Sequence, residues 1–235
     1  GEDVRWATFP SIAVGWTFSD EKFMKPFYWL SFGKIRASWG QSGVQFDKAY
    51  LAHGLMGIGS IYDGERGMSA SGILNRKLGW EQSDQYDLGL DLSLGGFNIT
   101  VDWFKKQTKD LLFQKQVPKY NGGGTYWVNQ GKLNNTGVEM SLTTFPVKGA
   151  VTWETSLNAS YVKNEVADLA GDDFVLTANY SDLGGPLQIM KPGYPMGSFY
   201  VYQWKGFDDK GANLYQKADG SLTTNPTSDD LVVKG

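Results

Sequence analysis

Apolar and polar side chains alternate along residues 86–110, in two runs separated by Gly95-Gly96. Successive side chains of a strand point to opposite faces, so each run predicts a strand with one apolar and one polar face. Two adjacent glycines supply the positive φ angles that a tight turn requires. The pattern therefore predicts a hairpin. The apolar positions are Tyr86, Leu88, Leu90, Leu92, Leu94, Phe97, Ile99, Val101 and Trp103.

The same alternation recurs in other parts of the chain and predicts about six long strands in all. The connections between these strands alternate between short and long. The two long connections, 42–79 and 111–130, are rich in glycine and show no clear period. Outer-membrane barrels show this alternation because their short turns face the periplasm and their long loops face outside. The other predicted strands lie in 6–18, 32–41, 137–145 and 152–162.

The length of the hairpin arms favours a membrane over a soluble core. Each arm carries about 9–11 alternating residues, the span that a tilted strand needs to cross a bilayer. Tyr86 and Trp103 lie at one level of the apolar stripe and Phe97 lies at the other, as in the aromatic girdles of barrels. Lys34 and Arg36 on a polar face fit a water-filled lumen better than a dry core.

These features predict an all-β protein that contributes part of an antiparallel transmembrane β-barrel. Residues 1–165 would supply barrel strands with short periplasmic turns and long extracellular loops, and 166–235 an extracellular loop region with short strands. The alternative is a soluble β-sandwich carbohydrate-binding module. A barrel places five of these side chains outermost, whereas a sandwich places them innermost. The five are Leu88, Leu90, Leu92, Ile99 and Val101.

Composition and charge exclude several other classes of protein. Of the 235 residues 41% are apolar, and no run approaches the roughly 20 apolar residues of a membrane helix. The net charge of −3, without a basic patch, argues against a nucleic-acid partner. Cysteine is absent, which excludes disulfides, thiolate zinc sites and cysteine nucleophiles. No signal peptide precedes Gly1, so we expect a piece of a longer protein.

Two predicted outer loops carry clusters of aromatic residues, which are the candidate substrate-binding residues. Flat aromatic faces stack on sugar rings, and neighbouring Asn, Asp and Lys side chains can bond hydroxyls. The alternative is that these rings pack the loops together or belong to the girdle. The candidates are Tyr120, Tyr126 and Trp127 in one loop and Tyr200, Tyr202 and Trp204 in the other.

The polar residues predict neither catalysis nor a cofactor. Glu81, Glu139 and Glu154 share the polar side of their strands, but the strand spacing places no two of them at a separation that hydrolyses glycosides. His53 is the single histidine, so a Ser/His/Asp triad or a histidine zinc site has no second member. A glycosidase remains a weaker third hypothesis, which release of reducing sugar would test.

Acidic residues in the last third of the chain predict turns rather than a metal site. Asp208-Asp209 and Asp219-Gly220 have turn composition, and neither has the spacing of the twelve-residue calcium loop. We therefore assign no metal ligand.

Short motifs run in a fixed order along nearly the whole chain. Together they resemble the C-terminal half of the barrel in SusC/RagA-like TonB-linked outer-membrane transporters of Bacteroidetes. The motifs are Phe9-Pro10-Ser11, Gly15-Trp16, Ile35-Arg36-Ala37-Ser38-Trp39-Gly40, Trp80-Glu81, Gly89-Leu90-Asp91, Asp102-Trp103-Phe104, Thr108-Lys109-Asp110-Leu111-Leu112, Asn129-Gln130-Gly131, Asn135-Thr136-Gly137-Val138-Glu139 and Gly197-Ser198-Phe199-Tyr200.

This resemblance implies a function and a set of partners. Members of the family form 22-stranded barrels in the cell outer membrane and import oligosaccharides, or less often peptides, beneath a SusD-like surface lipoprotein. Energy reaches them through TonB, whose contact segment and plug domain lie N-terminal to the matching region and outside this chain. The chain departs from the family pattern at 200–206 and before Trp80, which leaves the substrate open.

Overall fold

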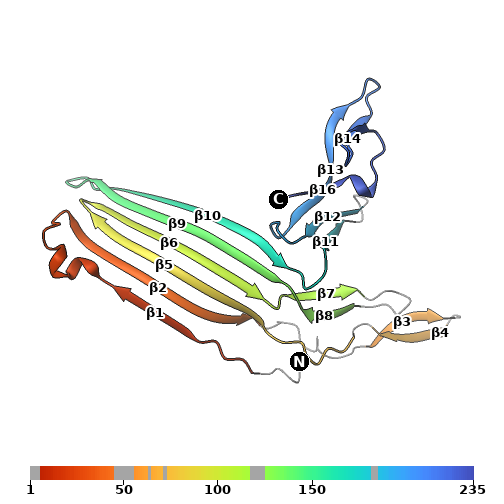
Figure 1. The fold of residues 1–235 in the computed structure, drawn as a ribbon, viewed down its shortest axis with the longest axis horizontal. Helices are drawn as coiled ribbons and strands as arrows, with labels where there is room; N and C mark the ends of the chain where they lie inside the picture. Colours follow the sequence, from red (N-terminus) through yellow and green to blue (C-terminus); the bar gives the residue numbers. More distant parts are fainter. Residues whose placement is uncertain (1–5, 45–55, 63–64, 71–72, 117–124, 181–184) are drawn as a thin grey trace. The chain divides into compact units, whose positions relative to one another are not determined.

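The computed structural model describes residues 6–44, 56–62, 65–70, 73–116, 125–180 and 185–235 (Figure 1). The candidate residue Tyr120 and the single histidine, His53, lie outside these ranges. The chain divides into two compact units, Gly1–Lys163 and Asn164–Gly235. Within the described ranges, no helix is long and apolar enough to cross a membrane.

The first unit is built on a six-stranded sheet. Its strands follow one another across the sheet in the same order as along the chain. Figure 1 shows these strands side by side, in the order β1-β2-β5-β6-β9-β10. The pairs from β1 to β9 are antiparallel, with long continuous registers. The bounds are β1 Ser11–Trp16, β2 Leu30–Val44, β5 Glu81–Leu94, β6 Phe97–Lys109, β9 Lys132–Val147 and β10 Trp153–Asp168.

The register gathers the apolar side chains on one face of this sheet. Val14 pairs with Ala37, which pairs with Leu88, and Leu88 pairs in turn with Trp103. Val138 of β9 continues the same row beyond Trp103. Cross-strand neighbours of this kind are the contacts that stabilise a sheet. One apolar row therefore crosses five strands.

No described strand packs on this apolar face to form a second layer, and only Phe18 of the short 3-10 helix η1 (Phe18–Asp20) covers it, at Gly33. Leu88 is 50% exposed, and Leu90, Leu92, Ile99 and Val101 are half-buried by their neighbours within the sheet. The sandwich alternative requires these five side chains to be innermost, so it is wrong for this chain. The buried apolar residues of the described ranges lie elsewhere and are Leu78, Leu111, Val166, Leu169, Ile189 and Met190.

The two long connections contain strands that the sequence pattern did not predict. The connection before β5 holds β3 (Met56–Tyr62) and β4 (Glu65–Ala70), and the connection after β6 holds β7 (Leu112–Gln116) and β8 (Thr125–Asn129). Each pair forms a two-stranded antiparallel ladder. These strands have seven residues or fewer and two contain glycine, so their alternation is too short to identify by periodicity.

The second unit is a smaller, irregular sheet with its own apolar core. Its order is β11-β12-β13-β14-β15, and β16 pairs with β13. Val166, Leu169, Ile189 and Met190 form the core and are almost completely buried. The bounds are β11 Val175–Tyr180, β12 Gly185–Met190, β13 Ser198–Phe207, β14 Asn213–Gln216, β15 Leu222–Thr223 and β16 Leu231–Lys234.

Candidate functional site

Three of the predicted substrate-binding residues lie on one side of β13 and begin an aromatic strip. Tyr200, Tyr202 and Trp204 alternate along the strand and therefore share a face. Tyr215 is the register partner of Trp204, and its ring lies 5.9 Å from that of Tyr202. At the opposite end, the ring of Phe174 lies 6.3 Å from that of Tyr200. The aromatic strip consists of Phe174, Tyr200, Tyr202, Trp204, Phe207 and Tyr215.

A β-bulge brings the last ring into the strip. Phe207 lies three residues after Trp204, which in a regular strand would place it on the opposite face. The register shifts between Trp204 and Gly206, and Gly206 has a φ of 115°, so the bulge inserts an extra residue. As a result, the ring centroids of Trp204 and Phe207 are 5.4 Å apart in an edge-to-face contact.

The rings at this end of the strip are fixed in orientation and open to solvent. Trp204 Nε1 donates a hydrogen bond of 3.1 Å to Asn213 Oδ1. Trp204 is 54% exposed and Phe207 is 63% exposed. Rigid aromatic side chains lose little conformational entropy on binding, and this arrangement is suited to a ligand with a flat apolar face.

The other predicted aromatic cluster does not form a comparable surface. Tyr126 and Trp127 are adjacent residues of β8, so their side chains point to opposite faces of the β7–β8 hairpin. Their register partners are Lys115 and Gln114. The backbone of Trp127 is also held in place, because its carbonyl oxygen accepts a hydrogen bond of 2.8 Å from Asn75 Nδ2.

Asn129 joins three segments at the base of the β7–β8 hairpin, a role that the sequence reading did not assign. Its Oδ1 accepts a hydrogen bond of 2.7 Å from the Gly79 N–H, and its Nδ2 donates to the Gly79 and Asp110 carbonyls, each at 3.1 Å. Asp110 has a φ of 56°, which turns the chain between β6 and β7. The Asn129-Gln130-Gly131 motif was the only sequence signal for this contact.

The face opposite the apolar stripe carries an ion-pair network centred on Arg36. Its Nε and Nη2 donate to Asp91 at 2.7 and 3.0 Å, and Nη2 also donates to Asp102 at 2.9 Å. A two-pronged contact of this kind fixes the guanidinium plane. A second pair, Lys109 with Asp84, has an N–O distance of 2.7 Å. Charges therefore line the polar face, as expected of a wall that meets water.

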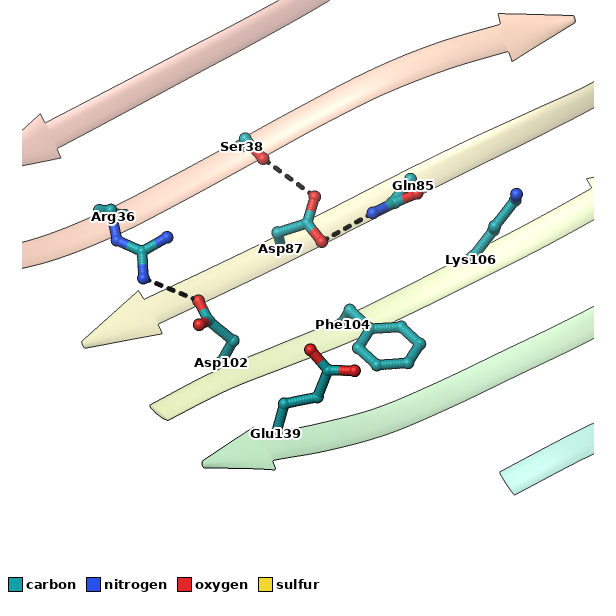
Figure 2. A pocket seen from close by; sticks show the side chains of 8 residues that line it. All are labelled: Arg36, Ser38, Gln85, Asp87, Asp102, Phe104, Lys106 and Glu139. Atoms are coloured by element: carbon teal, nitrogen blue, oxygen red, sulfur yellow. Dashed lines mark hydrogen bonds and ion pairs between the residues drawn. The ribbon is translucent and has the colours of Figure 1, made fainter. Parts of the chain in front are cut away.

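An open hollow of about 490 Å³ lies beside this network on the polar face (Figure 2). Its lining comes from β2, β5, β6 and β9. Asp87 accepts hydrogen bonds there from Ser38 at 3.0 Å and from Gln85 at 2.9 Å. Glu139, one of the carboxylates noted in the sequence, also lines the hollow. The complete lining is Arg36, Ser38, Gln85, Asp87, Asp102, Phe104, Lys106 and Glu139.

Sequence comparison places the chain among known receptors. Residues 1–227 match the family model described as TonB dependent receptor-like, beta-barrel. The TonB-dependent receptor P39 of Formosa agariphila is 33% identical over 229 residues, covering 96% of this chain and 21% of the relative. The TonB-dependent receptor SusC of Bacteroides thetaiotaomicron is 33% identical over 246 residues, covering 94% of this chain and 24% of the relative.

Structural comparison agrees with the sequence matches. The RagAB peptide importer in its closed-closed state superposes with a TM-score of 0.85 and 26% identity, covering 99% of this chain and 26% of that chain. This chain spans only about a quarter of the length of such proteins. These matches confirm the fold class and the resemblance inferred from the sequence. The chain belongs to the TonB dependent receptor-like β-barrel family of outer-membrane proteins, and its sheet is part of a barrel of the SusC and RagA type.

Proposed function

We propose that the protein to which this chain belongs imports oligosaccharides across the outer membrane. The observation that carries this proposal is the aromatic strip. Two rings at its end, Trp204 and Phe207, are exposed, and a hydrogen bond to Asn213 fixes the indole of Trp204. Sugar rings present flat C–H faces that stack on such side chains, and polar groups beside the rings can bond the hydroxyls. The Asn213 side chain, which accepts the hydrogen bond of Trp204, supplies a polar group next to the strip.

Peptide import is the second candidate, and the structural relative favours it. The RagAB protein that superposes on this chain is described as a peptide importer. Aromatic rings also bind apolar peptide side chains, so the strip alone does not separate the two cargoes. Exposed rings with the Asn213 amide beside them suit a neutral, hydroxyl-rich ligand, and we therefore give oligosaccharides first place.

The proposed importer works with partners outside this chain. A SusD-like surface lipoprotein would hold the cargo over the barrel, and TonB would supply energy through the N-terminal part of the protein. The apolar stripe of the sheet would contact the lipid bilayer of the cell outer membrane. The family consists of transporters and receptors, which agrees with the expectation that the chain is not an enzyme.

Uptake by cells that carry the full-length protein tests this function. A strain lacking the gene is complemented with wild type or with Trp204→Ala, and uptake of labelled oligosaccharides and peptides is measured. Phe199→Ala is the matched control, because Phe199 is 55% exposed on the opposite side of β13. We expect Trp204→Ala alone to weaken oligosaccharide uptake about five- to tenfold.

Two results would contradict the proposal. Uptake of peptides but of no oligosaccharide by the wild type would transfer the function to the second candidate. Equal uptake by Trp204→Ala and Phe199→Ala would remove the aromatic strip from the substrate path.

A further inference from the structure

The connection between β1 and β2, residues 17–29, lies at the same end of the sheet as the two short turns. Neighbouring strands are antiparallel, so successive connections alternate between the two ends of a sheet. Residues 95–96 and 148–152 join the other strand pairs at this end (Figure 1). Outer-membrane barrels have their short connections on the periplasmic side, so this end would meet the periplasmic leaflet of the membrane.

The backbone of this β1–β2 connection is ordered by its own hydrogen bonds. It forms two short 3-10 helices, η1 (Phe18–Asp20) and η2 (Lys22–Met24). Along the connection, N–H groups donate repeatedly to the carbonyl three residues earlier, at distances of 2.9–3.1 Å. These donors are Glu21, Met24, Phe27 and Leu30. The connection is therefore a compact structure rather than an extended loop.

Aromatic side chains hold the connection on the apolar face of the sheet. Trp16 belongs to that face by alternation along β1, and its Nε1 donates a hydrogen bond of 3.1 Å to Glu21 Oε1. The ring of Phe18 lies over Gly33, where a Cβ atom would clash with it. The ring centroid of Trp16 lies 6.1 Å from that of Phe18 and 6.3 Å from that of Phe23. The connection thus folds onto the side of the sheet that carries the apolar stripe.

Large apolar side chains of the connection remain open to the surroundings. Phe23 is 58% exposed and Trp29 is 55% exposed, and the ring of Phe27 lies 6.1 Å from that of Trp29. Lys22 and Lys25 are exposed close to Phe23 in the sequence, and neither makes a hydrogen bond or ion pair with a residue in the described ranges. Exposed apolar side chains bordered by polar groups mark an interaction surface.

The parts of a transporter that lie outside this chain would not cover this surface. The other strands of a barrel continue the sheet sideways from β1 and β10, and a plug domain lies in the lumen. The outer face of a barrel wall borders the membrane. The exposure of Phe23 on that face therefore indicates a ligand in the membrane rather than a missing part of the protein.

We propose that the β1–β2 connection anchors the barrel to phospholipids of the periplasmic leaflet. Phe23, Phe27 and Trp29 would lie at the boundary between acyl chains and head groups, where aromatic rings settle. Lys22 and Lys25 would bind the phosphate groups, because long cationic side chains carry their charge into the head-group layer. This anchor goes beyond the proposed import function and does not depend on the cargo.

The position of the connection along the strands and its charges both fit a phospholipid. The last row of the apolar stripe at this end is formed by Leu30, Leu94 and Phe97, so the connection begins where hydrocarbon would give way to head groups. Asp20 and Glu21 offset the two lysines, and residues 17–29 carry no net charge. A zwitterionic head group, with one phosphate and one ammonium group, matches this balance.

Photo-crosslinking in the outer membrane identifies what contacts Phe23. Benzoylphenylalanine replaces Phe23 in the full-length protein, cells are irradiated, and adducts on the purified protein are identified by mass spectrometry. Phe145 is the matched control position, because it lies near the same end of β9 but on the polar face, one residue after the Phe97 partner Thr144. We expect phospholipid adducts at position 23 and none at position 145.

A lipid titration measures the contribution of the two lysines. Phosphatidylethanolamine is titrated into the detergent-purified full-length protein, and bound lipid is counted by native mass spectrometry. Lys22→Gln and Lys25→Gln should each weaken binding about two- to fivefold, as expected for an exposed ion pair. Lys148→Gln is the control and should bind lipid like the wild type, because Lys148 lies over the Phe145 ring, 5.3 Å from its centroid.

Three outcomes overturn the anchor. A second protein crosslinked at position 23 in place of lipid would make the connection a protein-docking surface. Equal phospholipid adducts at positions 23 and 145 would show that the connection makes no preferred contact with lipid. Lipid binding by Lys22→Gln and Lys25→Gln equal to that by Lys148→Gln would show that the lysines bind no phosphate. None of these results bears on cargo uptake, so the proposed function would stand.

Discussion

Arg36 reaches Asp102 across a strand that lies between them, because the intervening residue is Gly89. The Arg36 Nη2 to Asp102 Oδ1 distance is 2.9 Å, although the two residues belong to β2 and β6. A Cβ atom at Gly89 would lie 2.5 Å from Asp102 Oδ1 and 2.7 Å from the guanidinium carbon. The missing side chain on β5 is therefore what permits an ion pair to bridge three strands.

Replacing Gly89 should damage the protein through this contact. The added methyl group of Gly89→Ala must displace either the guanidinium or the Asp102 carboxylate, and overpacking of this kind costs about 1–3 kcal/mol. We expect a lower midpoint in denaturant unfolding of the full-length transporter, followed by tryptophan fluorescence.

Gly15→Ala provides the control in the same register row. A Cβ atom at Gly15 would meet only the Lys34 side chain closely, with Cε at 3.1 Å, and that flexible chain can move aside. An equal loss of stability in both variants would show that the Arg36–Asp102 bridge is unimportant.

The two carboxylates that flank Arg36 should depend on each other through it. Arg36→Met leaves Asp91 and Asp102 without their counter-charge, so we expect destabilisation that Asp102→Asn partly relieves. Groups within one ion-pair network show coupling energies of about 0.5–3 kcal/mol in double-mutant cycles. The cycle is measured by denaturant unfolding of the four proteins. If the effects of Arg36→Met and Asp102→Asn on the free energy of unfolding are strictly additive, solvent already screens the Arg36–Asp102 ion pair.

The sequence predicted which residues share a face, but not which residues become neighbours. Alternation alone places Leu88 and Trp103 on the apolar side and Arg36 on the polar side, because the period of a strand is fixed. The Arg36–Asp102 bridge depends on the register between β2 and β5, whose connection is long and without a period. Nothing local to either strand specifies that register.

The candidate binding residues show the same limit. Tyr200, Tyr202 and Trp204 share a face by simple alternation, so their grouping could be read from the sequence. Phe207 joins them only through the bulge at Gly206, and Tyr215 only through pairing with β14. Tyr126 and Trp127 were grouped by proximity in sequence, yet adjacent residues of a strand point apart.

Removing the Asn129 side chain should loosen the outer hairpins without unfolding the sheet. Asn129→Ala loses the hydrogen bonds to Gly79 and Asp110 that hold the chain before β5 and after β6. We expect faster cleavage within 73–130 when protease is added to intact cells carrying the full-length protein.

Asn98→Ala is the control for that experiment. Asn98 makes one side-chain hydrogen bond among the described residues, from Ser93 at 2.8 Å, at the short turn between β5 and β6. It should leave the cleavage rate unchanged. A rate in Asn129→Ala equal to the control would show that other contacts hold the hairpin bases.

Acidification should break the hydrogen bonds by which the Asp230 carboxylate joins the backbone of Thr227 to that of Ala218 in the second unit. Asp230 Oδ2 accepts from the Thr227 N–H at 2.9 Å, and Oδ1 accepts from the Ala218 N–H at 3.2 Å. The backbone N–H of Thr227 is the main reason that the pKa of Asp230 is lowered from its usual value. Because the pKa of Asp230 is lower in the folded than in the unfolded protein, the stabilisation is fully present above the pKa of the unfolded protein, about 4. It is lost as the pH falls through the pKa of the folded protein.

Hydrogen exchange at the Ala218 and Thr227 amides measures this effect. After correction for intrinsic rates, the protection of these two amides in the wild type should decrease when the pH is lowered below about 4. In Asp230→Asn the same protection should be absent already at neutral pH. Asp229→Asn is the control, because Asp229 is exposed and makes no side-chain hydrogen bond to the described residues. Protection that is equal in the two variants would contradict the assignment.

A charge on the apolar stripe should prevent the barrel from entering the membrane, whereas the same charge on the polar face should not. Leu88 lies near the middle of β5 with half of its surface exposed. Arginine at the lipid-facing midplane of a barrel costs about 2–4 kcal/mol. Ser141 of β9 pairs with Thr100 on the polar face, so Ser141→Arg places the charge in water. We expect Leu88→Arg to lower the amount of folded full-length protein in outer-membrane fractions, and Ser141→Arg to match the wild type. Equal amounts of the two variants would mean that the apolar stripe does not face lipid, because only the surrounding medium distinguishes the two positions.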